Sequence, residues 1–298
     1  MSHSLELLSE HRCFDCWQRF YKHESQTIGL PMRFSVYLPP QLQAQAEKEA
    51  TSGAAVMGQG KVPVLFFLAG LTCTEETFMI KAGAQRYAAE HGLMLITPDT
   101  SPRGAGVEGE TDNWDLGVGA GFYLDATQPG WNQNYRMESY VTQELFDIAT
   151  QVLPGDSQRM GIFGHSMGGH GALTLALRHP GKYQSVSAFA PICAPLQCPW
   201  GEKAFSTYLG ADKAVWAEHD ASVLMSKVRN PYPAGILVDQ GLADNFLPTQ
   251  LYPEAFEQAC QQAGQPLTLR RHEGYDHGYY FIATFIQDHM EFHARHLK

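Results

Sequence analysis

The sequence predicts an α/β fold in which a mostly parallel central sheet has helices on both faces. The apolar run 62–68 is followed by helical spacing over 78–91 and a second apolar run, 93–96. Strand, helix and strand in this order form the repeating unit of a parallel sheet. Further along, an apolar run ends at Phe163, and Gly164-x-Ser166-x-Gly168 opens a helical stretch. Uninterrupted apolar runs are typical of parallel strands that are buried on both faces.

The first half of the chain adds a hairpin and two long loops to this pattern. Two β-like runs, around 17–21 and 33–38, should form a hairpin at the edge of the sheet. Residues 41–60 are rich in Gln, Ala, Glu and Gly without strong periodicity, so we expect a flexible, exposed loop. Residues 98–134 form a second long loop, and loops of this length inside a compact domain are usually functional.

The second half continues the alternation of helices and strands. We expect an inserted segment of helices or loops over 193–232, packed on the rest of the fold. The other expected elements are strands at 185–190, 235–240 and 267–272 and helices at 135–153, 250–263 and 279–297. Because no break in composition divides the chain, we expect one domain spanning 1–298.

Composition excludes several classes of protein. The net charge of −10 and the pI near 5.7 argue against nucleic acid or an anionic membrane as a partner. The longest apolar run is about ten residues, which is too short to span a bilayer. Residues 1–6 show no basic region followed by an apolar core, so we expect no signal peptide. The six cysteines are too sparse for a disulfide scaffold, and we expect reduced thiols and a cytoplasmic location.

The motif around Ser166 is typical of the nucleophile elbow of an α/β-hydrolase fold, where strand, tight turn and helix follow one another. We expect the turn to strain Ser166 and to leave no room for a Cβ at Gly164 or Gly168. It would place the hydroxyl and the first free N–H groups of the helix at the carboxyl edge of the sheet. The alternative is a plain small-residue turn, because Gly-x-Ser-x-Gly also occurs in unrelated loops.

Ser166 needs a base, and the base needs a group that orients it, because a serine hydroxyl is a weak nucleophile at neutral pH. On this fold the acid and then the histidine follow the serine, each in a loop after a strand. Asp244 and His277 occupy such positions. Asp239 lies inside a predicted strand and Asp276 lies beside the histidine, so both are weaker candidates for the acid.

The other histidines are not expected to take part in the chemistry. Three of them recur at helical spacing near the end of the chain: His289, His293 and His296. They could form a metal-binding face, but the charged residues beside them favour a solvated helix surface. His165 and His170 flank Ser166 too closely to act as its base. We therefore expect no metal site at these histidines.

An oxyanion hole needs two N–H donors aimed at the oxygen on which negative charge develops. Met167, directly after the nucleophile, should supply one donor. The loop that follows the long apolar strand should supply the other, and Leu71 is the residue of choice. The alternative for this loop is a plain turn before a helix.

Three cysteines are candidates for chemistry. Cys73 follows the expected oxyanion loop and should lie near the substrate pocket as a thiol without a catalytic role. Cys13-x-x-Cys16 has neither a second cysteine pair nor a thioredoxin-like context, so no zinc or redox role is predicted.

Several motifs resemble the S-formylglutathione hydrolase, or esterase D, family, and the likeness runs from about Cys13 to the end of the chain. They are more specific than Gly-x-Ser-x-Gly, as Cys198-Pro199-Trp200-Gly201 illustrates. They comprise residues 67–75, 98–104, 119–123, 164–173, 198–201, 238–241 with 243–244, and 276–282.

The resemblance implies a Ser166–His277–Asp244 triad that hydrolyses S-formylglutathione to formate and glutathione, a step in formaldehyde detoxification. This small molecule would be the partner, with no nucleic acid, membrane, metal or cofactor; whether the chain forms a homodimer is left open. Two alternatives also stay open. One is a general short-chain carboxylesterase or an acyltransferase on the same fold, and the other is a non-catalytic binding module.

Trp200 is the expected selector of small acyl groups. It lies in the inserted segment 193–232, which on this fold would pack over the nucleophile. An indole held beside Ser166 would leave room for little more than a formyl or acetyl group. Trp114 and Phe122, from the long loop, could supply the remaining wall. The alternative is a core tryptophan that does not contact the substrate.

Overall fold

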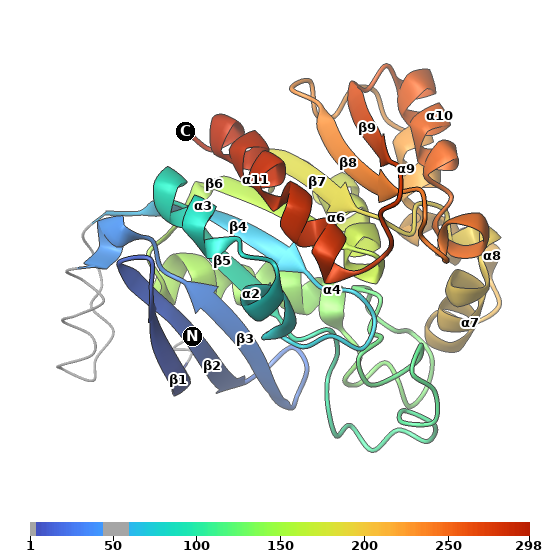
Figure 1. Ribbon diagram of the computed structural model, residues 1–298. Coiled ribbons are helices and arrows are strands. Elements are labelled where there is room, and N and C mark those ends of the chain that lie inside the picture. The colour runs from blue at the N-terminus through green and yellow to red at the C-terminus, as the bar shows by residue number, and fades with distance from the viewer. Residues whose placement is uncertain (1–3, 44–59) are drawn as a thin grey trace.

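The computed structural model describes residues 4–43 and 60–298, and its strands form a single nine-stranded sheet (Figure 1). The strands are Glu6–Cys13 (β1), Cys16–Glu24 (β2), Pro31–Tyr37 (β3), Val62–Leu68 (β4), Met94–Pro98 (β5), Gly155–His165 (β6), Ser185–Phe189 (β7), Ile236–Gly241 (β8) and Leu267–His272 (β9). Their order is β1-β2-β3-β5-β4-β6-β7-β8-β9. The pairs from β1 to β5 in this order are antiparallel and the rest are parallel. The predicted α/β fold with a mostly parallel sheet is confirmed.

The sequence predicts that the amino-terminal hairpin, formed by β2 and β3, lies at the edge of the sheet. In the structure it does not. A further strand, β1, pairs with β2 on its outer side. Its side chains are exposed or half-buried, so it lacks the apolar alternation that reveals a strand. Phe14 and Asp15, between the two strands, both have positive φ, as a two-residue hairpin turn requires. The loop predicted over 41–60 falls mostly outside the described residues.

Helices cover both faces of the sheet. They are Thr77–Lys81 (α2), Gln85–His91 (α3), Met137–Ser139 (α4), Leu145–Asp147 (α5), Met167–Arg178 (α6), Pro199–Tyr208 (α7), Lys213–Trp216 (α8), Ala221–Ser226 (α9), Pro253–Ala263 (α10) and Tyr279–His296 (α11). Shorter turns of helix lie at Pro40–Leu42, Tyr140–Glu144, Ile148–Val152, Pro195–Gln197, Ala217–His219 and Leu247–Leu251. In the view of Figure 1, α3 and α11 lie in front of the sheet and α6 lies behind it. No helix within the described residues is both long and apolar enough to cross a bilayer.

The structure divides one predicted helix in two and shows which of two alternatives holds for the inserted segment. The single helix expected over 78–91 is two helices, α2 and α3. Gly83 between them has φ +69°, a left-handed conformation that a continuous right-handed helix does not contain. The inserted segment expected over 193–232 is helical, because it contains α7, α8 and α9.

The order of the strands fixes where a site can form. The chain passes from β4 to β5 on one side and then returns to β6 on the other side of β4. In open parallel sheets, ligands bind beyond the carboxyl ends of the strands at such a switch point. In Figure 1 the long loop after β5 and helices α7 and α8 lie beyond the carboxyl end of β4. The loops after β4 and β6 therefore meet at this edge.

Two histidines of α11 are fully buried, so the prediction of a solvated helix surface was wrong. His293 contacts two serines of β7, with Nδ1 2.7 Å from Ser185 Oγ and Nε2 2.8 Å from Ser187 Oγ. His289 Nδ1 lies 2.8 Å from Ser187 Oγ, and its Nε2 lies 3.2 Å from Asp239 Oδ2. Burial lowers the pKa of both histidines, which favours their neutral forms. Among the described residues, no cluster of His, Cys, Asp or Glu could hold a metal ion.

Asp239, at the end of this hydrogen-bonded chain, is a structural carboxylate. Arg270 donates to both of its oxygens, from Nε to Oδ1 at 2.6 Å and from Nη2 to Oδ2 at 2.5 Å. Burial alone would raise the pKa of Asp239, but the hydrogen bonds from His289 and Arg270 lower it below its ordinary value. Asp239 is therefore an ionised group that joins β8, β9 and α11.

Asp239→Asn should lower the free energy of unfolding by about 3 kcal/mol, because a buried ion pair loses one partner. The folded fraction should keep most of the activity of the wild-type protein. The matched control is Asp288→Asn, since Asp288 pairs with the same arginine at 2.5 Å but is 47% exposed. That change should cost less than about 1 kcal/mol. Urea unfolding and kcat of both variants check this, and equal stability losses would contradict it.

Candidate active site

Ser166 occupies a strained turn between β6 and α6. Its backbone has φ 58° and ψ −120°, which few residues other than glycine adopt. A Cβ on Gly164 would lie 2.2 Å from the carbonyl oxygen of Gly168, and one on Gly168 would lie 1.9 Å from that of Leu68. Both distances are shorter than any allowed contact. The expected elbow geometry, with strain at the serine and glycine on either side, is confirmed.

Neighbouring backbones hold the serine in this conformation. Its N–H donates to the carbonyl oxygen of Phe189 at 3.0 Å, at the end of β7. Its own carbonyl oxygen accepts from the N–H of His170 at 2.9 Å and from that of Ile192 at 3.3 Å. Strain of this kind persists only where the surrounding structure determines it. The turn is fixed by both α6 and the loop after β7.

The structure brings Asp244 and His277 together. His277 Nδ1 lies 2.6 Å from Asp244 Oδ2, and this carboxylate is buried. The Nε2 of Gln240 donates to the same oxygen at 3.2 Å, and the N–H of Phe246 donates to Oδ1 at 2.8 Å. Asp276, the rejected neighbour, accepts from the N–H of Gly278 in its own turn. The arrangement leaves Nε2 of His277 as the ring nitrogen available to a nucleophile.

Backbone contacts between the loops after β8 and β9 bring Asp244 and His277 together. The N–H of Leu242 donates to the carbonyl oxygen of His272, and the N–H of Ala243 to that of Tyr275, both at 2.9 Å. A Cβ on Gly241 would lie 2.3 Å from the carbonyl oxygen of Tyr275, so only glycine allows this approach. The distance between the acid and the histidine is therefore set by backbone packing.

His277 also reaches the nucleophile elbow. Its ring centroid is 4.5 Å from that of His165, the residue before Ser166. Burial, and the proximity of His277, lower the pKa of His165 well below its ordinary value, which favours the neutral form of His165. Within the described residues no hydrogen bond joins Ser166 Oγ to His277, whose Nδ1 bonds to Asp244.

The segments that carry the two expected oxyanion donors adjoin the serine. A Cβ on Gly70 would be 3.1 Å from Ser166 Cβ, so the loop after β4 abuts the nucleophile. Met167 begins α6, and the N–H of a first helical residue has no partner inside its helix. In the part of the chain that the structure describes, the Leu71 N–H donates no hydrogen bond, whereas the next two N–H groups do. Both proposed donors are thus available.

A row of aromatic rings leads from solvent to His277. Trp114 is 56% exposed, and its ring centroid is 5.7 Å from that of Trp200, which is buried. Trp200 is 4.8 Å from Phe246, and Phe246 is 4.9 Å from His277. Trp200 is therefore one ring away from the histidine. Sequence reasoning missed Phe246, although its place two residues after Asp244 was a signal.

Phe122, the other aromatic residue expected at the pocket wall, belongs to the core. It is fully buried, and its ring packs edge-on against His170 and Phe205 at 6.1 and 6.3 Å. Its backbone φ of 50° is a left-handed conformation, which the composition of the loop did not reveal. The prediction that Phe122 contributes to the wall was wrong.

Cys73 is half-buried in the loop after β4. Burial raises the pKa of its thiol, and hydrogen bonding with Tyr279 and Thr77 only partly reduces this effect. The protonated form, which is a poor nucleophile, therefore predominates at neutral pH. Cys13 and Cys16 lie elsewhere, opposite each other at the turn between β1 and β2.

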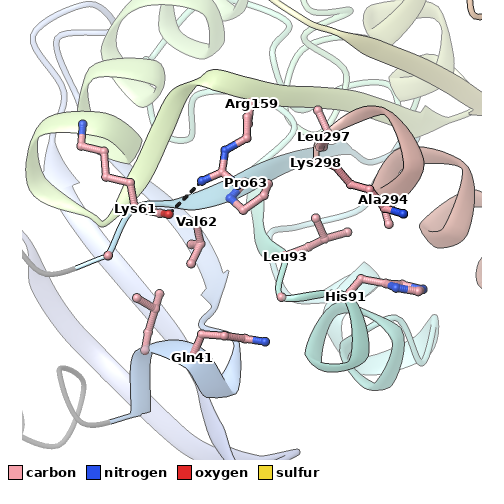
Figure 2. A pocket seen from close by; sticks show the side chains of 13 residues that line it. Gln41, Lys61, Val62, Pro63, His91, Leu93, Arg159, Ala294, Leu297 and Lys298 are labelled. Carbon is pink, nitrogen blue, oxygen red and sulfur yellow. Dashed lines mark hydrogen bonds between the residues drawn. The ribbon is translucent and has the colours of Figure 1, made fainter.

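A cavity of about 450 Å³ lies at the opposite edge of the sheet (Figure 2). It is lined by residues at the start of β4 and β5 and the end of α11, among them Pro63, Leu93 and Leu297. Arg159 reaches across it to the backbone oxygen of Lys61 at 2.9 Å. Because Ser166 follows the carboxyl end of β6, this cavity is separate from the candidate active site.

Comparisons with known proteins agree with this arrangement. Residues 25–292 match the model of the Esterase family, described as "Putative esterase". The chain is similar to the S-formylglutathione hydrolase of Mus musculus, with 52% identity over 99% of both chains. It is 51% identical to that of Arabidopsis thaliana over the full length of both. The structure of an S-formylglutathione hydrolase from Agrobacterium tumefaciens superimposes with a TM-score of 0.88, at 44% identity, covering 98% of this chain and 99% of the other.

Cys73→Ser should keep most of the activity and become resistant to bulky thiol reagents such as N-ethylmaleimide. An adduct on Cys73 would crowd the loop beside Ser166, whereas the sulfur itself has no chemical role. Cys260→Ser is the control, since Cys260 lies buried on α10 and its loss should leave the sensitivity unchanged. The measurement is the rate at which N-ethylmaleimide inactivates the wild-type protein, Cys73→Ser and Cys260→Ser. A folded but inactive Cys73→Ser, or one that stays sensitive, contradicts the prediction.

Proposed function

The chain belongs to the esterase family and, within it, to the S-formylglutathione hydrolases, and on this basis we propose that it hydrolyses S-formylglutathione to formate and glutathione. The observation that carries the proposal is the 2.6 Å hydrogen bond between Asp244 and His277 beside the strained Ser166. These side chains would form a catalytic triad, with His277 as base and Asp244 as its orienting group.

In the first half of the proposed reaction, His277 Nε2 takes the proton of Ser166 while Oγ attacks the formyl carbonyl carbon. The Leu71 and Met167 N–H groups stabilise the oxyanion of the tetrahedral intermediate. The carbon–sulfur bond then breaks, leaving a formyl ester on the serine. Glutathione departs as a thiol with the proton held by His277, or as a thiolate, in which case His277 releases that proton to solvent; with a thiol pKa near 8.5 the leaving group needs little help from an acid.

The second half regenerates the enzyme. His277 takes a proton from a water molecule, whose oxygen attacks the formyl ester, and the Ser166–carbon bond breaks. The serine oxygen recovers its proton from His277, and formate leaves. Throughout, Asp244 accepts the Nδ1 hydrogen of His277, which keeps Nε2 directed toward the reacting atoms and stabilises the imidazolium when it forms.

We further propose that the enzyme works in the cytoplasm with this small molecule as its partner, without nucleic acid or membrane. The buried cysteines Cys193, Cys198 and Cys260 are free thiols, as in compartments where disulfides do not form. The net charge of −10 supports the absence of a nucleic acid partner.

Ser166→Ala and His277→Ala should each reduce kcat for S-formylglutathione on the order of 10⁴-fold or more, because members of a triad act as a unit. Asp244→Asn should reduce it less. Release of glutathione, followed with a thiol reagent, measures the rate, and circular dichroism checks folding. A folded variant of Ser166 or His277 that keeps a tenth of the activity would overturn the triad.

The same assay separates the proposed reaction from its alternatives. A general carboxylesterase would turn over p-nitrophenyl acetate with a kcat/KM at least equal to that for S-formylglutathione. An acyltransferase would pass the formyl group to an added alcohol in preference to water. A non-catalytic protein would not be labelled at Ser166 by a fluorophosphonate.

Trp200→Ala should flatten the dependence of kcat/KM on acyl length. If the Trp200 indole limits the acyl pocket, the variant should gain about tenfold on butyryl esters and lose on the formyl substrate, because overlap is relieved while packing is lost. The measurement is kcat/KM for formyl, acetyl, propionyl and butyryl esters with both proteins. Trp216→Phe is the control, as Trp216 is buried on α8 and donates to the carbonyl oxygen of Gly210. An unchanged profile in Trp200→Ala would remove Trp200 from the acyl pocket.

A further inference from the structure

The loop that carries Leu71 is held on both sides by the long loop after β5. Before Leu71, the carbonyl oxygen of Ala69 accepts a hydrogen bond from the hydroxyl of Tyr123 at 2.9 Å. After it, the carbonyl oxygen of Cys73 accepts from Thr100 Oγ1 at 2.6 Å. Between these points, the N–H of Thr72 donates to the long loop at 2.9 Å. Three hydrogen bonds from one distant segment thus bracket the Leu71 N–H.

The backbone of this loop needs such support. Thr72 has φ +66°, a left-handed conformation that is unfavourable for a β-branched residue. The Gly119 carbonyl oxygen accepts the Thr72 N–H, and a Cβ on Gly119 would lie 3.1 Å from Thr72 Cα. The direction of the neighbouring Leu71 N–H therefore depends on contacts outside its own loop.

Tyr123 links this loop to the nucleophile helix. It is buried, and both it and the preceding residue, Phe122, have positive φ, at 52° and 50°. Its ring packs against α6, where a Cβ on Gly171 would lie 2.6 Å from Tyr123 Cδ2. The ring is thus fixed by the helix that begins at Met167, while its hydroxyl holds the loop that carries Leu71. One side chain connects the segments that bear both oxyanion donors.

We propose that Tyr123 is a positioning residue for the oxyanion hole, and that its hydroxyl sets the place of the Leu71 N–H relative to Ser166. Thr100 acts in the same way from the other side of the loop. The inference rests on the proposed function, because the proposed reaction uses the Leu71 N–H as an oxyanion donor. Tyr123 does not touch the reacting atoms. Its effect is on the geometry of a donor whose stabilisation is realised in the transition state.

Tyr123→Phe keeps the ring and removes only the hydroxyl. Loss of an oxyanion donor costs about 100- to 1,000-fold in kcat, and a displaced donor should cost less. We expect kcat for S-formylglutathione to fall about 10- to 100-fold, with KM changed less than about twofold, because the loss falls on the transition state. The inhibition constant of a boronic acid, which forms a tetrahedral anionic adduct on serine, should rise by a similar factor.

The matched control is Tyr232→Phe. Tyr232 is also buried, and its hydroxyl also donates to a backbone carbonyl oxygen, that of Ala176 at 3.1 Å near the other end of α6. The two variants lose equivalent hydrogen bonds and should show similar decreases in Tm. Only Tyr123→Phe should lose kcat and affinity for the boronic acid. Equal kinetic effects in both variants, or none in Tyr123→Phe, would overturn the proposal.

Thr100→Val provides a second test that does not depend on how Tyr123→Phe folds. It removes the hydroxyl that donates to Cys73 at the other end of the same loop, and it should also lower kcat rather than raise KM. Wild-type kinetics in Thr100→Val would contradict the assignment. If instead Ser166→Ala remained active, the proposed function itself would fail, so the two failures are distinguishable.

Discussion

The close approach of β4, β6 and α6 at the nucleophile turn is the constraint on which the site depends. A single added carbon at Gly164 or Gly168 would collide with a neighbouring carbonyl oxygen. The strain at Ser166 is maintained because its N–H and carbonyl oxygen are held by groups from β7, α6 and the following loop. The same contact places the loop after β4 against the serine. Ser166 and the segments that carry Leu71 and Met167 are therefore parts of one packed unit.

Two buried carboxylates, in and just after β8, have different roles because different groups surround them. Asp239 faces α11 and is saturated by Arg270 and His289, which leaves it no role toward the site. Asp244 lies beyond the strand end and accepts from His277, with Gln240 and the Phe246 N–H holding it in place. Both groups are buried, so burial alone did not distinguish them. What distinguishes them is which segments supply their hydrogen-bond donors.

The features that the sequence could predict are local in the chain. Continuous apolar runs mark β4 and β6, the glycines around Ser166 mark the elbow, and Asp244 and His277 follow strands in the order that the fold demands. The features that it could not predict depend on contacts between distant segments. The helix α11 has polar residues at buried positions because Ser185 and Ser187, about a hundred residues earlier, hydrogen-bond to them. Strand β1 is half-exposed and shows no apolar alternation.

The long loop after β5 is joined to the loop after β4 by hydrogen bonds at Tyr123, Thr100 and Gly119. Phe122 and Tyr123 in this loop, and Thr72 in the loop after β4, each adopt a left-handed conformation that costs free energy in a non-glycine residue. The contacts that compensate join this loop to the oxyanion loop and to α6, so the strained residues stabilise one another. A change in the long loop should therefore act on catalysis through the position of backbone donors, even when it leaves the substrate contacts intact. The positions of the donors are set by the packing between these segments. A loop of this length can therefore be part of a rigid site.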